Sequence, residues 1–263
     1  MKWDPSKYTE FSDYRGRPYT DLLGQLGQID ASKIIDLGCG PGNMTRLLAQ
    51  RWPDAQVEGL DSSAEMIAKA QSSVQEPNLN FALADATTWH PDADTDLLFS
   101  NAMLQWVPGH RQLLAGWLKE LKVGANLAIQ IPGNFGSPSH AVMRQVADSP
   151  KWADQLSGVL RHVDVVGEPD EYQRIFLEAG VQANVWESTY QQLLVGEDPI
   201  LNWVRGTALL PIRAALSAPD YAQFENDYRV AVAEHYPSFT AQDGTVLTNF
   251  PFRRIFMIGH KLG

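Results

Sequence analysis

A glycine-rich turn directly after an apolar run constrains the fold of this chain more than any other feature of its sequence. Residues 34–37 predict a buried strand. The alternate glycines Gly38, Gly40 and Gly42 allow the backbone to turn sharply and to approach a ligand where a side chain would intrude. A helix is expected to begin at about Asn43. Such a strand, turn and helix together are typical of nucleotide-binding folds.

The spacing of the glycines argues against a dinucleotide-binding turn. That fingerprint is G-x-G-x-x-G, whereas the third glycine here comes one position early and Asn43 stands where the fingerprint has glycine. Asp36 also places a carboxylate beneath the turn, which suits a ligand with amino and sulfonium cations better than a pyrophosphate. The pattern D-x-G-x-G-x-G resembles motif I of the class I S-adenosylmethionine-dependent methyltransferases, and this resemblance implies S-adenosyl-L-methionine as the cofactor.

Acidic residues recur at the ends of the next two predicted strands. Asp61 follows a strand at residues 57–60, where a carboxylate can accept both hydroxyls of a ribose. The alternatives are an exposed loop carboxylate and a simple partner of the helix dipole. Asp85 follows a strand at residues 79–83, where it can meet an adenine amino group or simply cap a turn. Residues 62–65, Ser-Ser-Ala-Glu, predict a capping box that opens a helix. The resemblance to these methyltransferases implies a cofactor site formed by Asp36, Gly38, Gly40, Asn43, Asp61, Ser62, Met66, Asp85, Ala86, Asn101 and Trp106.

Strands alternate with helices along most of the chain. The further predicted strands are residues 96–101, 127–131, 181–194 and 254–260. This alternation requires a parallel sheet with helices on both faces and a ligand site at the carboxyl ends of the strands. The expected fold class is therefore α/β, with a doubly wound, Rossmann-like sheet of seven mostly parallel strands.

Two stretches that depart from the alternation predict a helical cap. They lie at about residues 136–165 and 196–250, and apolar residues at helical spacing in the second stretch predict amphipathic helices. The chain has no internal repeat, low-complexity segment or linker. We therefore expect a single methyltransferase domain, residues 1–263, with the cap formed by insertions.

The bulk composition is that of an ordinary soluble globular protein. Its 263 residues are 44% hydrophobic, enough for one sizeable core with an extra lobe. A net charge of −10 disfavours nucleic acid as a partner, because binding its backbone needs a basic face. No segment approaches the roughly 20 apolar residues of a membrane helix, and the N-terminus lacks the apolar core of a signal peptide. We therefore expect no membrane partner and a cytoplasmic location.

The single cysteine and the histidines offer no catalytic group. Cys39 cannot form an internal disulfide, and a small residue packed beneath the turn is favoured over a nucleophile. The six histidines are scattered, without a metal-ligand pair at helical spacing, so no metal is expected. A surface or capping role is favoured for each, although His140 and His162 fall in the predicted cap.

Several arginines could assemble a local positive pocket for an acidic substrate. Taken singly, each arginine is better explained as a partner in a surface salt bridge. An acceptor that is already an anion needs no base, whereas nitrogen or phenol acceptors usually do. The arginines are Arg15, Arg17, Arg205, Arg213 and Arg254.

Narrower motifs extend over essentially the whole chain. They are Trp3-Asp4-Pro5 with Tyr8 and Phe11, Arg15-Gly-Arg-Pro18, Asn101-Ala102 with Leu104-Gln-Trp106, Gln130-Ile-Pro-Gly-Asn134, Trp186-Glu-Ser-Thr-Tyr190 and Phe250-Pro251 with Arg254-Ile-Phe256. In these motifs the sequence resembles the trans-aconitate 2-methyltransferase family. The match loosens around Arg205 and residues 252–253, which leaves the preference among polyacids open.

The resemblance implies transfer of a methyl group to one carboxylate of trans-aconitate, which gives a monomethyl ester. Because the acid is ionised at neutral pH, the enzyme would orient it, desolvate it and neutralise its charge, with no catalytic base. Two alternatives remain: a methyltransferase for another small acid or a quinone precursor, and a non-catalytic S-adenosylmethionine-binding module. The resemblance assigns the acceptor to Arg15, Gln130, Asn134, Tyr190, Trp203 and Arg254.

Overall fold

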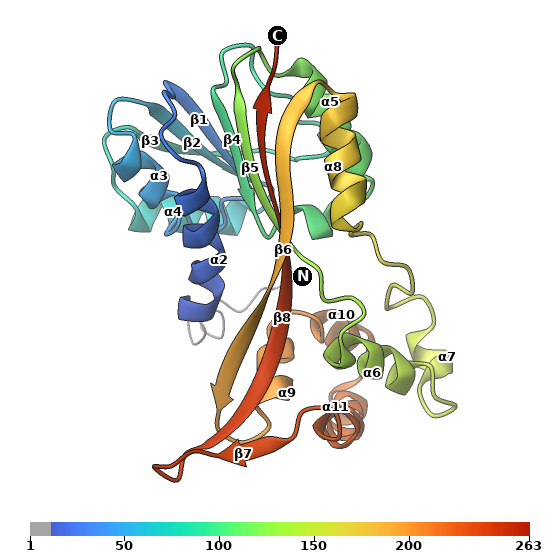
Figure 1. Cartoon of the computed structure of the whole chain (residues 1–263). Helices are drawn as coiled ribbons and strands as arrows, with labels where there is room; N and C mark the ends of the chain where they lie inside the picture. Colours follow the sequence, from blue (N-terminus) through green and yellow to red (C-terminus); the bar gives the residue numbers. More distant parts are fainter. Residues whose placement is uncertain (1–11) are drawn as a thin grey trace. The chain divides into compact units, whose positions relative to one another are not determined.

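The computed structural model describes residues 12–263, which divide into two compact units (Figure 1). The sheet unit comprises Arg15–Pro132, Val165–Ser188 and Arg254–Gly263. The helical unit comprises residues 12–14, Gly133–Asp164 and Thr189–Arg253. Trp3, Asp4, Pro5, Tyr8 and Phe11, which carry part of the family resemblance, lie outside the described residues.

The predicted α/β class and mostly parallel sheet are confirmed. The strand order is β3 (Leu79–Leu83), β2 (Gln56–Asp61), β1 (Lys33–Leu37), β4 (Leu97–Asn101), β5 (Asn126–Pro132), β8 (Val246–Lys261) and β6 (Val181–Val195). The first five strands are parallel, and β8 is antiparallel to β5. A short additional strand, β7 (Ser238–Thr240), pairs with β8.

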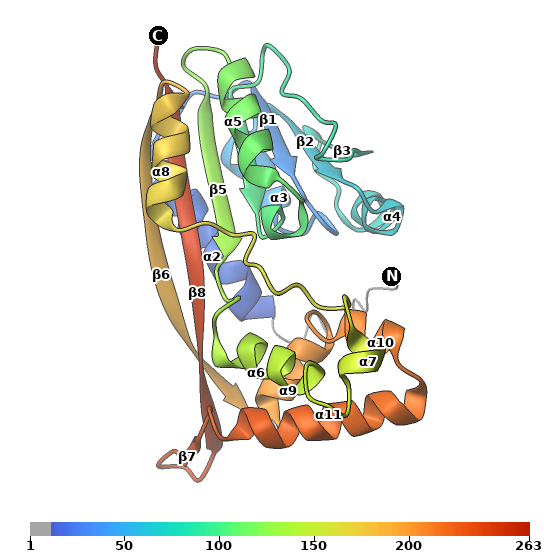
Figure 2. The same cartoon turned by 90° about the vertical axis from the view of Figure 1, so that its right-hand side faces the viewer.

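Helices cover both faces of the sheet unit. They are α2 (Ser12–Gln25), which begins in the helical unit, α3 (Arg46–Arg51), α4 (Ala64–Ser73), the 3-10 turn η1 (Leu104–Trp106), α5 (His110–Glu120) and α8 (Pro169–Glu178). Figure 2 shows α5 and α8 in front of the strands and α2 behind them. Trp117 of α5 and Phe176 of α8 are buried in one apolar cluster with Ile129 of β5. Burial of this helix face against the sheet forms the core.

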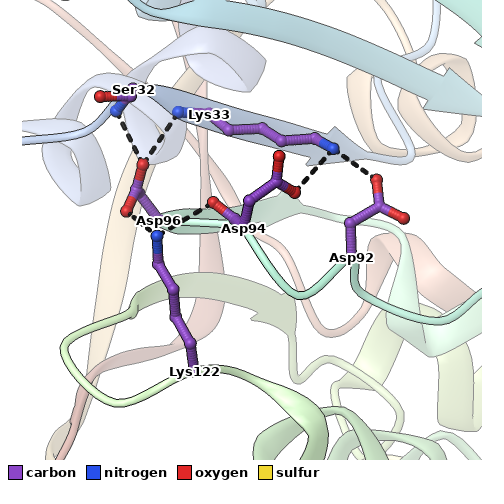
Figure 3. Close-up of polar contacts among 6 residues, drawn as sticks. All are labelled: Ser32, Lys33, Asp92, Asp94, Asp96 and Lys122. Atoms are coloured by element: carbon purple, nitrogen blue, oxygen red, sulfur yellow. Dashed lines mark hydrogen bonds and ion pairs between the residues drawn. The ribbon is translucent and has the colours of Figure 1, made fainter.

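Polar contacts join β1 and β4 at their amino ends (Figure 3). Asp96 Oδ2 accepts the backbone N–H groups of Ser32 and Lys33 at 2.8 and 3.0 Å, and Oδ1 pairs with Lys122 Nζ at 2.5 Å. Lys33 Nζ in turn pairs with Asp92 at 2.6 Å. Burial opposes ionisation of Asp96, but the Lys122 ion pair and the two N–H groups lower its pKa overall. These contacts brace the amino edge of the sheet and use no group at its carboxyl edge.

The helical unit has a core of its own. Its helices are α6 (Pro138–Ala147), α7 (Ala153–Leu156), α9 (Pro199–Arg205), α10 (Leu210–Ala215) and α11 (Ala218–Ala233). Trp152, Phe224, Tyr228 and Phe250 belong to its buried apolar cluster. None of the helices in the described part of the chain is both long enough and apolar enough to span a membrane.

The last strand begins at Val246 rather than at Arg254. Residues 238–250, placed in the cap by the sequence, form β7 and the first part of β8. Asp243-Gly244 lies in the turn between the two strands, with Gly244 in the left-handed region at φ +87°. Asp-Gly between short apolar runs is a hairpin signal that the sequence interpretation missed.

Candidate functional site

The candidate site lies where the strand order reverses, between β1 and β4. Ser100 Oγ of β4 donates a hydrogen bond to the Leu37 carbonyl of β1 at 2.7 Å, which joins the carboxyl ends of the two strands. Ligands of open α/β sheets bind outside the carboxyl ends at such a reversal. The predicted glycine turn follows β1 at this edge.

Three glycines of the turn adopt left-handed backbone conformations for different reasons. Gly38, Gly40 and Gly42 have φ values of +86°, +57° and +75°. A Cβ on Gly38 would lie 2.3 Å from Met103 Cγ, and one on Gly42 would lie 2.5 Å from Phe81 Cζ. A Cβ on Gly40 would meet nothing within 4 Å. The outer glycines therefore serve packing, while Gly40 leaves open space that a ligand can occupy.

Asp61 connects the glycine turn to the next helix. Its Oδ2 accepts the N–H of Gly40 at 3.0 Å, and its Oδ1 accepts the N–H of Ser63 at 2.9 Å. Since a carboxylate oxygen can accept more than one hydrogen bond, both oxygens keep capacity for ligand hydroxyls. Ser63, not Ser62, caps α4 and accepts the N–H of Met66 at 3.3 Å. The capping box predicted from Ser62 is therefore displaced by one residue, and Ser62 is exposed.

Asp36 lies buried under the turn, with only 2% of its surface exposed. Its Oδ2 accepts hydrogen bonds from Thr45 Oγ1 at 2.7 Å and from the Tyr19 hydroxyl at 3.3 Å. Burial raises the pKa of Asp36 to about 7, with a smaller contribution from Asp61, while the two hydroxyl donors act in the opposite direction. Burial also raises the pKa of Cys39, so its thiol is not activated.

Helix α3 begins at Arg46, three positions after the predicted start at Asn43. Residues 43–45 form a turn, and Thr45 directs its hydroxyl to Asp36 across that turn. Asn43 is exposed in this turn. The sequence interpretation missed both partners of Asp36. A threonine just before a helix is a local signal, whereas nothing near Tyr19 in the sequence points to Asp36.

The third strand ends in a carboxylate that organises a turn. Asp85 Oδ1 accepts the N–H and the Oγ1 of Thr87, both at 2.8 Å, and these hydrogen bonds lower the pKa of Asp85. Asp85 is exposed and Ala86 is buried. Trp106, on η1 after β4, is 63% exposed and offers an apolar surface. Met66 is buried on α4.

Two amide side chains with buried polar atoms lie on neighbouring strands near the ends of β4 and β5. Asn101 and Gln130 are register partners on these parallel strands. Asn101 Oδ1 and Gln130 Nε2 are buried and have no hydrogen-bond partner among residues 12–263. Gln130 Oε1 accepts a hydrogen bond from Arg254 Nη1 at 3.5 Å. Because an unsatisfied buried polar group costs about 1–3 kcal/mol, these groups indicate a polar ligand.

The acceptor residues inferred from the family resemblance are divided between the two units. Arg15, Gln130 and Arg254 belong to the sheet unit, with Arg15 in α2 and its side chain outside the described part. Asn134, Tyr190 and Trp203 belong to the helical unit and are all buried.

Two of these residues have structural contacts in the helical unit. The Asn134 side chain accepts the N–H of Arg253 at 2.9 Å and donates to its carbonyl at 3.2 Å. Trp203 packs in an aromatic cluster with Phe250 and Phe252, at centroid distances of 5.5 and 5.7 Å.

Other candidate groups of the helical unit are engaged in local contacts. Arg205 forms a bidentate ion pair with Glu225, with Nε and Nη2 each 2.7 Å from a carboxylate oxygen. His140 Nδ1 lies 3.2 and 3.1 Å from the hydroxyls of Ser137 and Ser139, and burial lowers the pKa of His140 to about 4. Within residues 12–263, no three His, Cys, Asp or Glu side chains are grouped to hold a metal ion.

Comparison with known proteins agrees with this geometry. Residues 34–124 match the family described as "Methyltransferase domain". The YcgJ protein of Bacillus subtilis has a similar solved structure, with a TM-score of 0.60 and 14% identity over 94% of this chain and 99% of that one. Phosphoethanolamine N-methyltransferase 2 of Haemonchus contortus, solved with S-adenosylhomocysteine, has a TM-score of 0.55 and 16% identity over 94% of this chain and 53% of that one.

The strand order, the glycine turn and the acidic strand ends define a class I S-adenosylmethionine-dependent methyltransferase. The chain is 49% identical to the trans-aconitate 2-methyltransferase of Streptomyces avermitilis over 98% of this chain and 97% of that protein. It belongs to the trans-aconitate 2-methyltransferase family.

Proposed function

We propose that this protein transfers the methyl group of S-adenosylmethionine to one carboxylate of trans-aconitate and forms a monomethyl ester. The observation that carries the proposal is the buried Gln130–Arg254 pair at the end of β5, beside the strand ends that form the cofactor edge. This pair offers a guanidinium and an amide donor, which suit an anionic acceptor and which a neutral acceptor would not need. Membership of the family supports the choice of acid.

The residues of the strand ends fit S-adenosylmethionine. The open space at Gly40 admits a ligand against the backbone, and Asp61 can accept the two ribose hydroxyls. Asp85 would receive the adenine amino group, and the buried Asn101 oxygen would receive an ammonium proton. The remaining proposed contacts are Asp36, Gly38, Asn43, Ser62, Met66, Ala86 and Trp106. When bound, the cofactor supplies an electrophilic methyl group on a sulfonium.

The acceptor carboxylate needs no catalytic base, because it is already ionised at neutral pH. One of its oxygens forms the new bond to the methyl carbon while the carbon–sulfur bond breaks, and the electron pair of that bond goes to sulfur. No proton moves. The reaction is an in-line displacement that requires an approach of about 3–3.5 Å with water excluded.

The protein's task is therefore to orient and desolvate an anion. Arg254 is only 5% exposed, so its charge acts in a medium of low dielectric where attraction to a carboxylate is strong. Gln130 Nε2 supplies a second donor from the neighbouring strand. Arg15, Asn134, Tyr190 and Trp203 are the remaining proposed acceptor residues. A small-molecule substrate is consistent with the cytoplasmic location that we expect for this protein.

The proposal is tested with a panel of acceptors. Purified protein is incubated with S-adenosylmethionine and, separately, with trans-aconitate, cis-aconitate, citrate and a neutral phenol. We expect a base-labile methyl ester from trans-aconitate. Turnover of the phenol without turnover of any polyacid would favour a quinone precursor, and cofactor binding without any methyl transfer would favour a non-catalytic module.

A further inference from the structure

A tyrosine of α2 contacts the buried carboxyl group under the glycine turn. Tyr19 is 2% exposed, and its hydroxyl donates to Asp36 Oδ2 at 3.3 Å. Its ring packs against Phe99 of β4, with the centroids 4.6 Å apart. Thr45, at the start of α3, donates to the same oxygen at 2.7 Å. Asp36 Oδ2 therefore receives one hydroxyl donor from α2 and one from the segment just before α3.

We propose that Tyr19 is a positioning residue that holds Asp36 as an ionised carboxylate beneath the glycine turn. Through this contact, the packing of α2 affects the affinity for the cofactor. The inference rests on the proposed function, because it requires a ligand that carries positive charge above the turn. Tyr19 itself does not touch the ligand in this scheme. It acts through Asp36.

The groups around Asp36 determine how its charge responds to pH. Burial and the nearby carboxylate of Asp61 disfavour ionisation, while the hydroxyls of Tyr19 and Thr45 favour it. Burial raises the pKa of Tyr19 well above its usual value and also raises that of Cys39, so both neighbours stay neutral near pH 7. Asp36, with a pKa of about 7, is the group that titrates in this range.

The sign of the linkage follows from this arrangement. A ligand that places an ammonium group above the turn binds more tightly when Asp36 is ionised, so its affinity rises as the pH increases through about 7. Removal of the Tyr19 hydroxyl removes a donor that favours the ionised form. The carboxyl then ionises only at higher pH, and the loss of affinity is concentrated at neutral and acidic pH.

The test is the dissociation constant of S-adenosylhomocysteine for Tyr19→Phe, measured by calorimetry between pH 6 and 8.5 and divided by the wild-type value. This ratio cancels titration of the ligand itself. Loss of this hydrogen bond to the carboxylate predicts binding about fivefold weaker at pH 7 and within about 1.5-fold of wild type at pH 8.5. Phenylalanine keeps the ring against Phe99, so folding should be preserved.

Two further variants keep the test sharp. Tyr14→Phe is the matched control, because the Tyr14 hydroxyl, also on α2, donates to the Leu193 carbonyl at 2.8 Å within the helical unit. The dissociation constant of Tyr14→Phe divided by the wild-type value should be the same at every pH. Thr45→Val removes the shorter hydrogen bond to Asp36 and should give a larger shift in the same direction.

The outcomes separate the inference from the proposed function. If the ratio of dissociation constants for Tyr19→Phe is independent of pH, Tyr19 only packs against its neighbours. This result would overturn the inference but not the proposed function. Failure of the wild-type protein to bind S-adenosylhomocysteine would overturn the proposed function, and the inference with it. A ratio that rises toward low pH in Tyr19→Phe but not in Tyr14→Phe supports the coupling.

Discussion

Replacement of Gly40 by alanine tests whether the open space at the glycine turn belongs to the cofactor. Gly40 has φ +57°, so a side chain there incurs the left-handed penalty of about 1–2 kcal/mol. The added Cβ meets no protein atom within 4 Å, so no packing cost is added in the free protein. The melting temperature should therefore fall by about 2–4 °C per kcal/mol, and the fold should persist.

Cofactor binding should suffer far more than stability. The methyl group would project into space that we assign to the ligand, and overpacking of this kind costs about 1–3 kcal/mol. That cost corresponds to a rise of about 5- to 150-fold in the dissociation constant of S-adenosylhomocysteine. Isothermal calorimetry gives the binding constant, and urea unfolding gives the stability.

Gly124→Ala is the matched control. Gly124 has φ +87°, and a Cβ there also meets nothing within 4 Å, but it lies just before β5 at the amino end of the strand. The free energy of unfolding of Gly124→Ala should fall by about as much as that of Gly40→Ala, while its affinity for the cofactor stays at the wild-type value. Wild-type affinity in Gly40→Ala, or equal loss of affinity in both variants, would refute the reasoning.

Three further substitutions test other parts of the account. Asp61→Ala removes the acceptor of the Gly40 N–H and of the proposed ribose hydroxyls, and should weaken S-adenosylhomocysteine by about 10- to 100-fold in calorimetry; unchanged affinity would show that the ribose assignment is wrong. Arg254→Gln should raise the KM for trans-aconitate by at least about tenfold with little change in the KM for the cofactor, and equal increases in steady-state assays would move Arg254 to the cofactor. Asp96→Asn should lower the urea midpoint at pH 7. The lowered pKa of Asp96 means that its stabilisation is present above its unfolded pKa of about 3.9 and is lost as the pH falls through the folded value. A difference between wild type and Asp96→Asn that does not shrink below about pH 3.9 would contradict this assignment.

Local sequence patterns predicted most of the sheet. The first six strands lie within about a residue of their expected ends, because apolar runs bounded by glycine, proline or acidic residues are local signals. The β7–β8 hairpin was missed although its Asp243-Gly244 turn is a local signal. Helix α3 begins three residues after the expected Asn43, because residues 43–45 form a hydrogen-bonded turn before it.

The candidate site also has parts that the sequence predicts and parts that it does not. The glycine turn and the carboxylates at strand ends are features of short segments. The alternation of strands and helices predicts that they meet at the carboxyl edge of the sheet. The Tyr19–Asp36 contact and the Gln130–Arg254 pair join residues that are 17 and 124 positions apart. Their proximity depends on helix docking and on the antiparallel register of β8 against β5. The arginine pattern and the family resemblance suggested Arg254, but only the register, which pairs Arg254 with Pro132, sets it two residues from the partner of Gln130.

The central claim is methyl transfer from S-adenosylmethionine to a carboxylate oxygen of trans-aconitate. The most direct test supplies cofactor with an isotopically labelled methyl group and follows the label by mass spectrometry and alkaline hydrolysis. The account predicts one labelled methyl group per product molecule, released as methanol by alkali together with unlabelled trans-aconitate. A label that stays on the acid after alkali, or that never leaves the cofactor, would contradict it.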